Sequence, residues 1–175
     1  MHDLHHRDAR DFPAAQLRAS PFELRLAEAT DEPFLVELYT STHGQQFALL
    51  PLAPAELDTL LRMQFNAQRT GYRQQYPQSQ DFIIMVDGKA GGRVWLNESA
   101  TEVLVVDIAV LPQHQGRGYG TAVLQQLIDD ARRTGRTVRL HVDRMNVRAA
   151  QLYRRLGFQV RSENEIFEEM ELAPR

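Results

Sequence analysis

The chain has 175 residues, of which 43% are hydrophobic, and this length and composition suit one domain with its own core. It contains no cysteine, which excludes disulfides, thiolate metal sites and a cysteine nucleophile, and its formal net charge of -3 gives no overall attraction to nucleic acid or anionic lipid. No run of about 18 apolar residues is present and no signal-peptide stretch opens the chain, so we expect a cytoplasmic protein with no membrane or nucleic-acid partner.

The N-terminal end, residues 1–20, is rich in charge and poor in periodic apolar residues, which is typical of a mobile arm. It contains His2, His5 and His6, but no acidic or further histidine ligand is fixed near them. A solvated arm is therefore favoured over a metal site, and we expect no bound metal. Residues 21–175 are predicted to form a single domain.

The domain opens with a strand and a helix. Residues 22–27 alternate between apolar and polar side chains, which predicts a half-buried strand. Thr30 or Asp31 then caps a helix that has Pro33 in its first turn. Residues 41–52 are predicted to form a loop.

A second helix and a three-strand meander follow. The helix begins near Pro54 and runs through Phe65, before a polar stretch at residues 68–80 that breaks at a proline. Strands are predicted over residues 81–86 and 91–96, because an Asp-Gly turn typical of hairpins joins them. A third strand, over residues 102–111, is almost unbroken in its apolar character, which predicts cover on both faces.

Residues 115–120 read Gln-Gly-Arg-Gly-Tyr-Gly and form a glycine-rich turn from this strand into a helix at residues 121–133. Such a turn favours phosphate, because glycines let the backbone approach closely and the first helical turn supplies unpaired N–H donors. A Walker A loop would end in Gly-Lys-Ser/Thr, and a Rossmann turn reads G-x-G-x-x-G, so neither pattern matches. One feature favours the Rossmann pattern: Asp143 lies about where a Rossmann domain places the acid that binds the ribose. A purely structural turn remains the alternative to a phosphate site.

The last third continues with a strand over residues 137–142 and a short helix capped by Asn146 and ended by Gly157. Residues 158–161 and 166–172 are predicted to be a closing pair of strands.

Two motifs in tandem, within about residues 101–160, carry a family resemblance. The glycine loop matches (Q/R)-x-x-G-x-(G/A), and the following block matches N-x-x-A-x-x-x-Y-x-x-x-G-F. The matching residues are Gln115, Gly118, Gly120, Asn146, Ala149, Tyr153, Gly157 and Phe158. The chain thereby resembles bacterial-type members of the GNAT superfamily of acyl-CoA-dependent N-acyltransferases. This resemblance implies an α/β (α+β) fold: a mixed, mostly antiparallel sheet of about seven strands, flanked by about four helices and splayed between the fourth and fifth strands.

The resemblance also implies acetyl-CoA, or coenzyme A, as co-substrate. Its pyrophosphate would lie on the amides of residues 115–121, and its pantetheine arm would pair with the end of the fourth strand, where an N–H near Val110 would polarise the thioester carbonyl. Small alanines on the following helix would let it approach. The implied binding residues are Ile108, Ala109, Val110, Gln115, Gly116, Arg117, Gly118, Tyr119, Gly120, Thr121, Asn146, Ala149 and Tyr153.

Three residues are candidates for proton transfer. Tyr153 would protonate the departing thiolate, whereas a core tyrosine is the structural alternative, as a helix cap is for Asn146. An amine acceptor arrives as ammonium and must lose a proton, for which His141 and Asp107 are rival bases. The structural alternatives are a solvent-facing side chain for His141 and burial of Asp107 against a backbone amide. A water relay is the third candidate for taking the proton.

The expected function is transfer of acetyl from acetyl-CoA to a primary amine of a small molecule or peptide, by direct attack on the thioester. A catalytically silent acyl-CoA-binding or interaction module is the alternative, and a homodimer is compatible with both. The first two helices are expected to wall the acceptor pocket. Aromatic candidates for its walls, and arginines that would favour a carboxylate-bearing acceptor, are Tyr39, Phe47, Phe65, Tyr72, Tyr76, Arg69 and Arg73.

Overall fold

The computed structural model describes residues 22–47 and 50–174. The expected N-terminal arm, with its three histidines, lies outside the described residues. Between residues 22 and 174, with that two-residue gap, no helix has both the length and the apolar character needed to cross a membrane.

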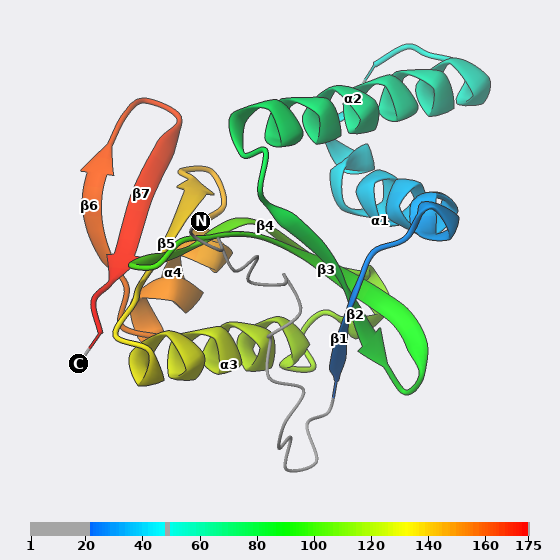
Figure 1. The fold of residues 1–175 in the computed structure, drawn as a ribbon. Helices are drawn as coiled ribbons and strands as arrows, with labels where there is room; N and C mark the ends of the chain where they lie inside the picture. Colours follow the sequence, from blue (N-terminus) through cyan, green and yellow to red (C-terminus); the bar gives the residue numbers. More distant parts are fainter. Residues whose placement is uncertain (1–21, 48–49, 175) are drawn as a thin grey trace, which may run out of the picture.

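One seven-stranded sheet runs through the described chain (Figure 1). Its spatial order is β1-β2-β3-β4-β5-β7-β6, and only β4 and β5 are parallel neighbours. The strands are β1 Glu23–Leu26, β2 Gln80–Val86, β3 Lys89–Glu98, β4 Glu102–Val110, β5 Thr137–Asp143, β6 Gln159–Glu163 and β7 Phe167–Leu172.

Four α-helices cover the two faces of this sheet. Helices α1 and α2 lie on one side, and α3 and α4 lie on the other (Figure 1). Their bounds are α1 Glu32–His43, α2 Pro54–Gln75, α3 Tyr119–Arg133 and α4 Val147–Arg155. The predicted fold class, a mixed and mostly antiparallel sheet flanked by four helices, is confirmed.

The two faces have separate cores. On the α3 side, Val123, Leu124, Leu127 and Ile128 are almost fully buried, as their helical spacing predicts. On the α1 side a smaller cluster forms, and it contains Leu35, Val36, Phe65 and Ile83.

The largest differences from the predicted boundaries lie around the first two helices. Helix α2 continues to Gln75, because its polar residues after Phe65 lie on an exposed helical surface and the chain breaks only before Pro77. The predicted loop at residues 41–52 begins with the last turn of α1 and a 3-10 turn at Gly44–Phe47.

The splay predicted between the fourth and fifth strands is present. Strands β4 and β5 pair from Glu102↔Thr137 to Val105↔Leu140 and then separate, although both continue. Beyond that point β4 still pairs with β3, so its other edge has no strand partner among the described residues. Only the first half of β4 is buried on both faces, which limits the predicted double cover to Val103–Val105.

Asp31 takes the N-cap position of α1, but its side chain is used elsewhere. Its carboxylate accepts two hydrogen bonds from Arg25, both at 2.7 Å, and one from Glu28 N at 2.8 Å. The hydrogen bonds from Arg25 lower the pKa of Asp31 to about 2. A lowered carboxyl pKa stabilises the folded state above the unfolded value of 3.8, and this contribution disappears as the pH falls towards 2.

We therefore expect Asp31→Asn to lower the free energy of unfolding by about 1–2 kcal/mol at pH 7, a range reduced for the exposure of Arg25. The deficit should shrink between pH 4 and pH 2 in urea unfolding curves. Asp58→Asn is the matched control, because the Asp58–Arg62 pair is exposed on both sides and should contribute less than about 0.5 kcal/mol. A constant deficit for Asp31→Asn down to pH 2 would contradict the assignment.

Candidate active site

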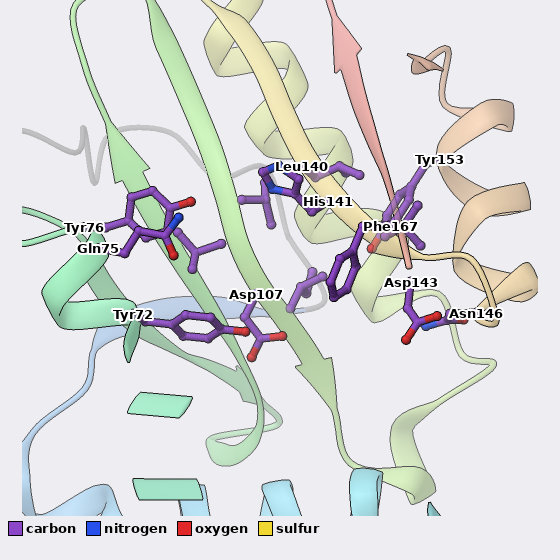
Figure 2. A pocket seen from close by; sticks show the side chains of 14 residues that line it. Tyr72, Gln75, Tyr76, Asp107, Leu140, His141, Asp143, Asn146, Tyr153 and Phe167 are labelled. Carbon is purple, nitrogen blue, oxygen red and sulfur yellow. The ribbon is translucent and has the colours of Figure 1, made fainter. Parts of the chain in front are cut away.

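A cavity of about 370 Å³ lies in the splay between β4 and β5. Its lining comes from five elements, and Figure 2 shows side chains from α2 on one side and from α4 on the other. The lining residues are Tyr72, Gln75 and Tyr76 of α2, Val105, Val106, Asp107 and Ile108 of β4, Leu140, His141, Val142 and Asp143 of β5, Asn146 and Tyr153 at α4, and Phe167 of β7.

A β-bulge aims Asp107 at this cavity. Leu96 pairs with Val105 and Trp95 pairs with Asp107, so Val106 is an extra residue without a partner in β3. The bulge reverses the alternation of side chains, which puts Asp107 on the α2 face although Val105 belongs to the core on the α3 side. Asp107 Oδ2 accepts a hydrogen bond from Arg93 at 2.9 Å, so its partner is a guanidinium and not the backbone amide considered above.

His141 extends from β5 on the α2 face and is exposed, as the solvent-facing alternative required, yet it also lines the cavity. Neither of its ring nitrogens has a hydrogen-bond partner among the described residues. Partial burial lowers the pKa of His141 below its ordinary value; Arg139 acts in the same direction and Glu102 opposes it. The imidazole is therefore neutral at pH 7 and has a free lone pair, as a base requires.

Tyr153 enters the cavity from α4 (Figure 2). The residue is 8% exposed, and its ring packs edge-on against Phe158, with 5.9 Å between ring centroids. Burial raises the pKa of Tyr153 to about 12, and the charge of Asp107 acts in the same direction. The hydroxyl therefore keeps its proton at neutral pH. It has no hydrogen-bond partner within the described part of the chain, so this proton is available to a ligand.

Helix α4 packs one side against the core. Ala150 and Tyr153 are its buried residues, and Leu152 and Leu156 are partly buried against the same core cluster. The ring of Tyr153 thus belongs to the core as well as to the cavity wall.

Asn146 performs the capping role that its position suggested. Its Oδ1 accepts a hydrogen bond from Ala149 N at 3.1 Å at the start of α4. The residue also lines the cavity, so its amide nitrogen remains available there.

The glycine loop has the backbone geometry of an anion site. Gly116 and Gly118 have φ values of +74° and +87°, which side chains with a Cβ rarely adopt. Gly118 is the N-cap of α3, and the first helical hydrogen bond runs from Ala122 N to Gly118 O at 2.8 Å. The amides of residues 119–121 therefore precede the helical hydrogen-bond ladder and are available to a ligand.

Gln115 joins this loop to β4. Its side-chain Nε2 donates a hydrogen bond to Val110 O at 2.9 Å. This bond occupies one of the carbonyls expected to pair with a pantetheine arm, and it fixes the loop relative to the strand edge.

The structure gathers only part of the predicted site in one cavity. The predicted residues that line it are Asp107, Ile108, His141, Asn146 and Tyr153. The others, Ala109, Val110, Ala149 and residues 115–121, lie outside its lining. Sequence patterns missed Phe167 and the bulge at Val106, because strand alternation carries no sign of which distant strand faces the splay.

Fewer of the predicted acceptor-binding residues line the cavity than expected. Of the predicted walls, Tyr72 and Tyr76 line the cavity, whereas Phe65 is a core residue. Arg69 pairs with Glu32 at 3.0 Å and lies over the Phe65 ring, so it does not reach the cavity.

Comparisons with known proteins bear on the family and on the fold. The chain is 38% identical over 86 residues to an N-acetyltransferase of Methanocaldococcus jannaschii; the alignment covers 45% of this chain and only 38% of that protein. The PaiA N-acetyltransferase of Thermoplasma acidophilum, solved with coenzyme A, superposes with a TM-score of 0.66 at 17% identity, over 88% of this chain and 99% of that one. The ribosomal-protein-S18-alanine N-acetyltransferase of Escherichia coli gives 0.60 at 23% identity, over 87% and 94%.

These two solved structures share the fold of this chain. The model of the Acetyltransferase (GNAT) family matches residues 49–158, which is more than half of the sequence. The chain belongs to the Acetyltransferase (GNAT) family.

Proposed function

We propose that the chain is an acetyl-CoA-dependent N-acetyltransferase that acts on a primary amine of a small molecule or peptide. The observation that carries the proposal is the cavity in the β4–β5 splay, which brings a neutral histidine, a protonated tyrosine and a carboxylate together. Membership of the GNAT family supports the reaction class.

The residues around the splay suit coenzyme A. The glycine loop offers consecutive backbone amides and open space, since a Cβ built on Gly118 would meet no atom within 4 Å. The unpaired edge of β4 offers backbone groups to an extended ligand. The residues that would hold acetyl-CoA are Ile108, Ala109, Val110, Gln115, Gly116, Arg117, Gly118, Tyr119, Gly120, Thr121, Asn146 and Ala149.

When bound, acetyl-CoA supplies an acetyl group activated as a thioester. In the proposed reaction His141 takes a proton from the acceptor ammonium, so that the amine nitrogen can form the new C–N bond as the C–S bond breaks. Tyr153 then gives its phenolic proton to the departing sulfur, and the proton that the acylated nitrogen loses as it becomes an amide returns to the Tyr153 oxygen. The raised pKa of Tyr153 and the lowered pKa of His141 leave each group in the protonation state that its role needs at neutral pH.

The alternative, a silent acyl-CoA-binding module, needs only the glycine loop and the β4 edge. It gives no role to a tyrosine and a histidine that both lack partners and face one cavity. A release assay for free CoA thiol over a panel of amines and peptides separates the two functions.

Acetyl-CoA binding itself is tested at Gly118. A valine there would strain a backbone with φ of +87° and place methyl groups in front of the loop amides. Acetyl-CoA at about 100 times its Kd should stabilise the wild-type chain by about 2.7 kcal/mol. We expect Gly118→Val to remove most of this stabilisation in thermal unfolding experiments.

Gly135→Val is the matched control. Gly135 has φ of +67°, lies just after the other end of α3, and a Cβ there would also meet no atom within 4 Å. This variant should lose similar intrinsic stability but keep the full effect of acetyl-CoA. Undiminished stabilisation of Gly118→Val would rule out the loop as the phosphate site.

A further inference from the structure

A buried arginine holds the carboxylate that faces the cavity. Arg93 is 3% exposed and lies on β3, on the same face as Trp95 and Asp107. Its Nη2 donates to Asp107 Oδ2 at 2.9 Å, its Nε lies 3.4 Å from Asp81 Oδ1, and its guanidinium carbon lies 4.9 Å from the Trp95 ring centroid. Trp95 on β3 pairs with Asp81 on β2 at one side and with Asp107 on β4 at the other. The guanidinium therefore lies over the tryptophan, with a carboxylate on either side.

This cluster is not electrically balanced. Two carboxylates share one guanidinium, so these three residues carry one net negative charge when both acids are ionised. Burial raises the pKa of Asp81 to about 6, whereas the charges of Arg93, Arg69 and Arg73 act in the opposite direction. Asp81 and Arg93 do not line the cavity, whereas Asp107 does, with its side chain 25% exposed. Of these three residues, only Asp107 therefore presents its charge to the cavity. A desolvated anion of this kind favours a cation beside it.

The remainder of the cavity offers no positive charge to an acceptor. Among the described residues that line it, none is a lysine or arginine, and Asp143 adds a second carboxylate. Tyr72, Tyr76 and Phe167 provide aromatic walls, and Tyr72 points from α2 towards Asp107 (Figure 2). Aromatic rings and a carboxylate together suit an ammonium group on an apolar or aromatic body.

We infer that Asp107, positioned by Arg93, binds the ammonium of the acceptor, and that the cavity selects primary amines with no carboxylate beside the amino group. This inference rests on the proposed function and names the substrate class of the same site. An α-carboxylate would lie near Asp107 and Asp143 without a counter-charge, and such like-charge contacts are strongly unfavourable. It also divides the work between the rival bases: Asp107 holds the ammonium and His141 takes its proton.

Three acceptors of similar bulk test the selection: 2-phenylethylamine, phenylalaninamide and phenylalanine. Their kcat/KM values are measured by CoA thiol release, and their Kd values by calorimetry on protein saturated with CoA. We expect the amine and the amide to have kcat/KM values on the order of 100-fold higher than that of phenylalanine, and Kd values on the order of 100-fold lower. Equal kcat/KM and Kd values for all three acceptors would overturn the inference. It would also be overturned if phenylalaninamide reacted and bound as weakly as phenylalanine, because the bulk of the substituent, and not its charge, would then cause the discrimination.

Asp107→Asn tests the ammonium site. It should raise the KM and Kd of 2-phenylethylamine about 30-fold or more and reduce the discrimination against phenylalanine. The control is Asp143→Asn, since Asp143 Oδ1 already accepts from Met145 N at 2.8 Å and an asparagine oxygen can do the same. A smaller loss of amine affinity in Asp143→Asn supports specific pairing of the ammonium with Asp107. Equal losses in both variants would mean that the negative potential of the whole cavity, and not one specific pair, attracts the amine.

Arg93→Lys tests the positioning role, because lysine keeps the charge but not the planar fork. We expect a raised KM for the amine and an unchanged KM for acetyl-CoA, with folding checked by circular dichroism. An amine KM equal to that of the wild type in the folded variant would contradict this role. Because the calorimetric arm needs no turnover, failure of the inference is distinct from failure of the proposed function, which would appear as loss of CoA stabilisation and of all transfer.

Discussion

Tyr153→Phe should lower kcat on the order of 100-fold or more while the protein stays folded. The hydroxyl forms no hydrogen bond within the described residues, and the ring keeps its edge-on contact with Phe158, so the free energy of unfolding should change by less than about 1 kcal/mol. The loss arises because the sulfur must then leave as an unprotonated thiolate. Steady-state kinetics with an acceptor on which chemistry limits turnover gives the measurement, and the Kd of acetyl-CoA should stay close to that of the wild type.

Tyr39→Phe is the matched control for this change. Tyr39 is stacked on His43 and does not line the cavity, so loss of its hydroxyl should leave kcat within a few-fold of wild type. Tyr72 is the rival donor, because it lines the same cavity and burial raises its pKa as well. If Tyr72→Phe lost the activity and Tyr153→Phe kept it, the acid would be Tyr72.

The raised pKa of Tyr153 also predicts how kcat depends on pH. At about 12 it lies above the range in which kinetics is measured, so Tyr153 should contribute no alkaline limb to kcat below about pH 10. An ordinary tyrosine, with its pKa near 10, would begin to lose activity within that range.

The elements around the site could be predicted because each has a local signature. The glycine loop combines alternate glycines with an amphipathic helix behind it, and Asn146 stands three residues before the amide that it caps. Seven strands and four helices follow from such patterns, and the splay follows from the family resemblance. Patterns of this kind depend on neighbours in sequence.

The charge cluster could not be predicted, because its members are far apart in sequence. Arg93 lies 12 residues after Asp81 and 14 before Asp107, and its partners are set by strand register. The bulge at Val106 decides on which face Asp107 lies, yet the apolar run around it reads equally well without a bulge. Which of the predicted residues share one cavity is likewise a tertiary property.

His141→Gln should reduce kcat/KM about 10- to 100-fold and remove the acid limb of its pH profile. The base must be neutral to accept a proton, so activity should fall as the pH drops through the pKa of His141. Burial and Arg139 put that pKa below the ordinary 6.5, so the limb should lie below pH 6.5 in the wild type. Glutamine keeps a polar side chain of similar reach, and the Kd of acetyl-CoA should be unchanged.

His43→Gln serves as the control, since His43 ends α1 and is stacked on Tyr39, outside the cavity lining, and it should keep the acid limb. The comparison with Asp107→Asn then separates the rival bases. Asp107 already accepts a hydrogen bond from Arg93, whereas both nitrogens of His141 are free within the described residues, so the limb should persist in Asp107→Asn and vanish in His141→Gln. The reverse pattern would make Asp107 the base, and an unaltered limb in both variants would leave a water relay to carry the proton out of the splay.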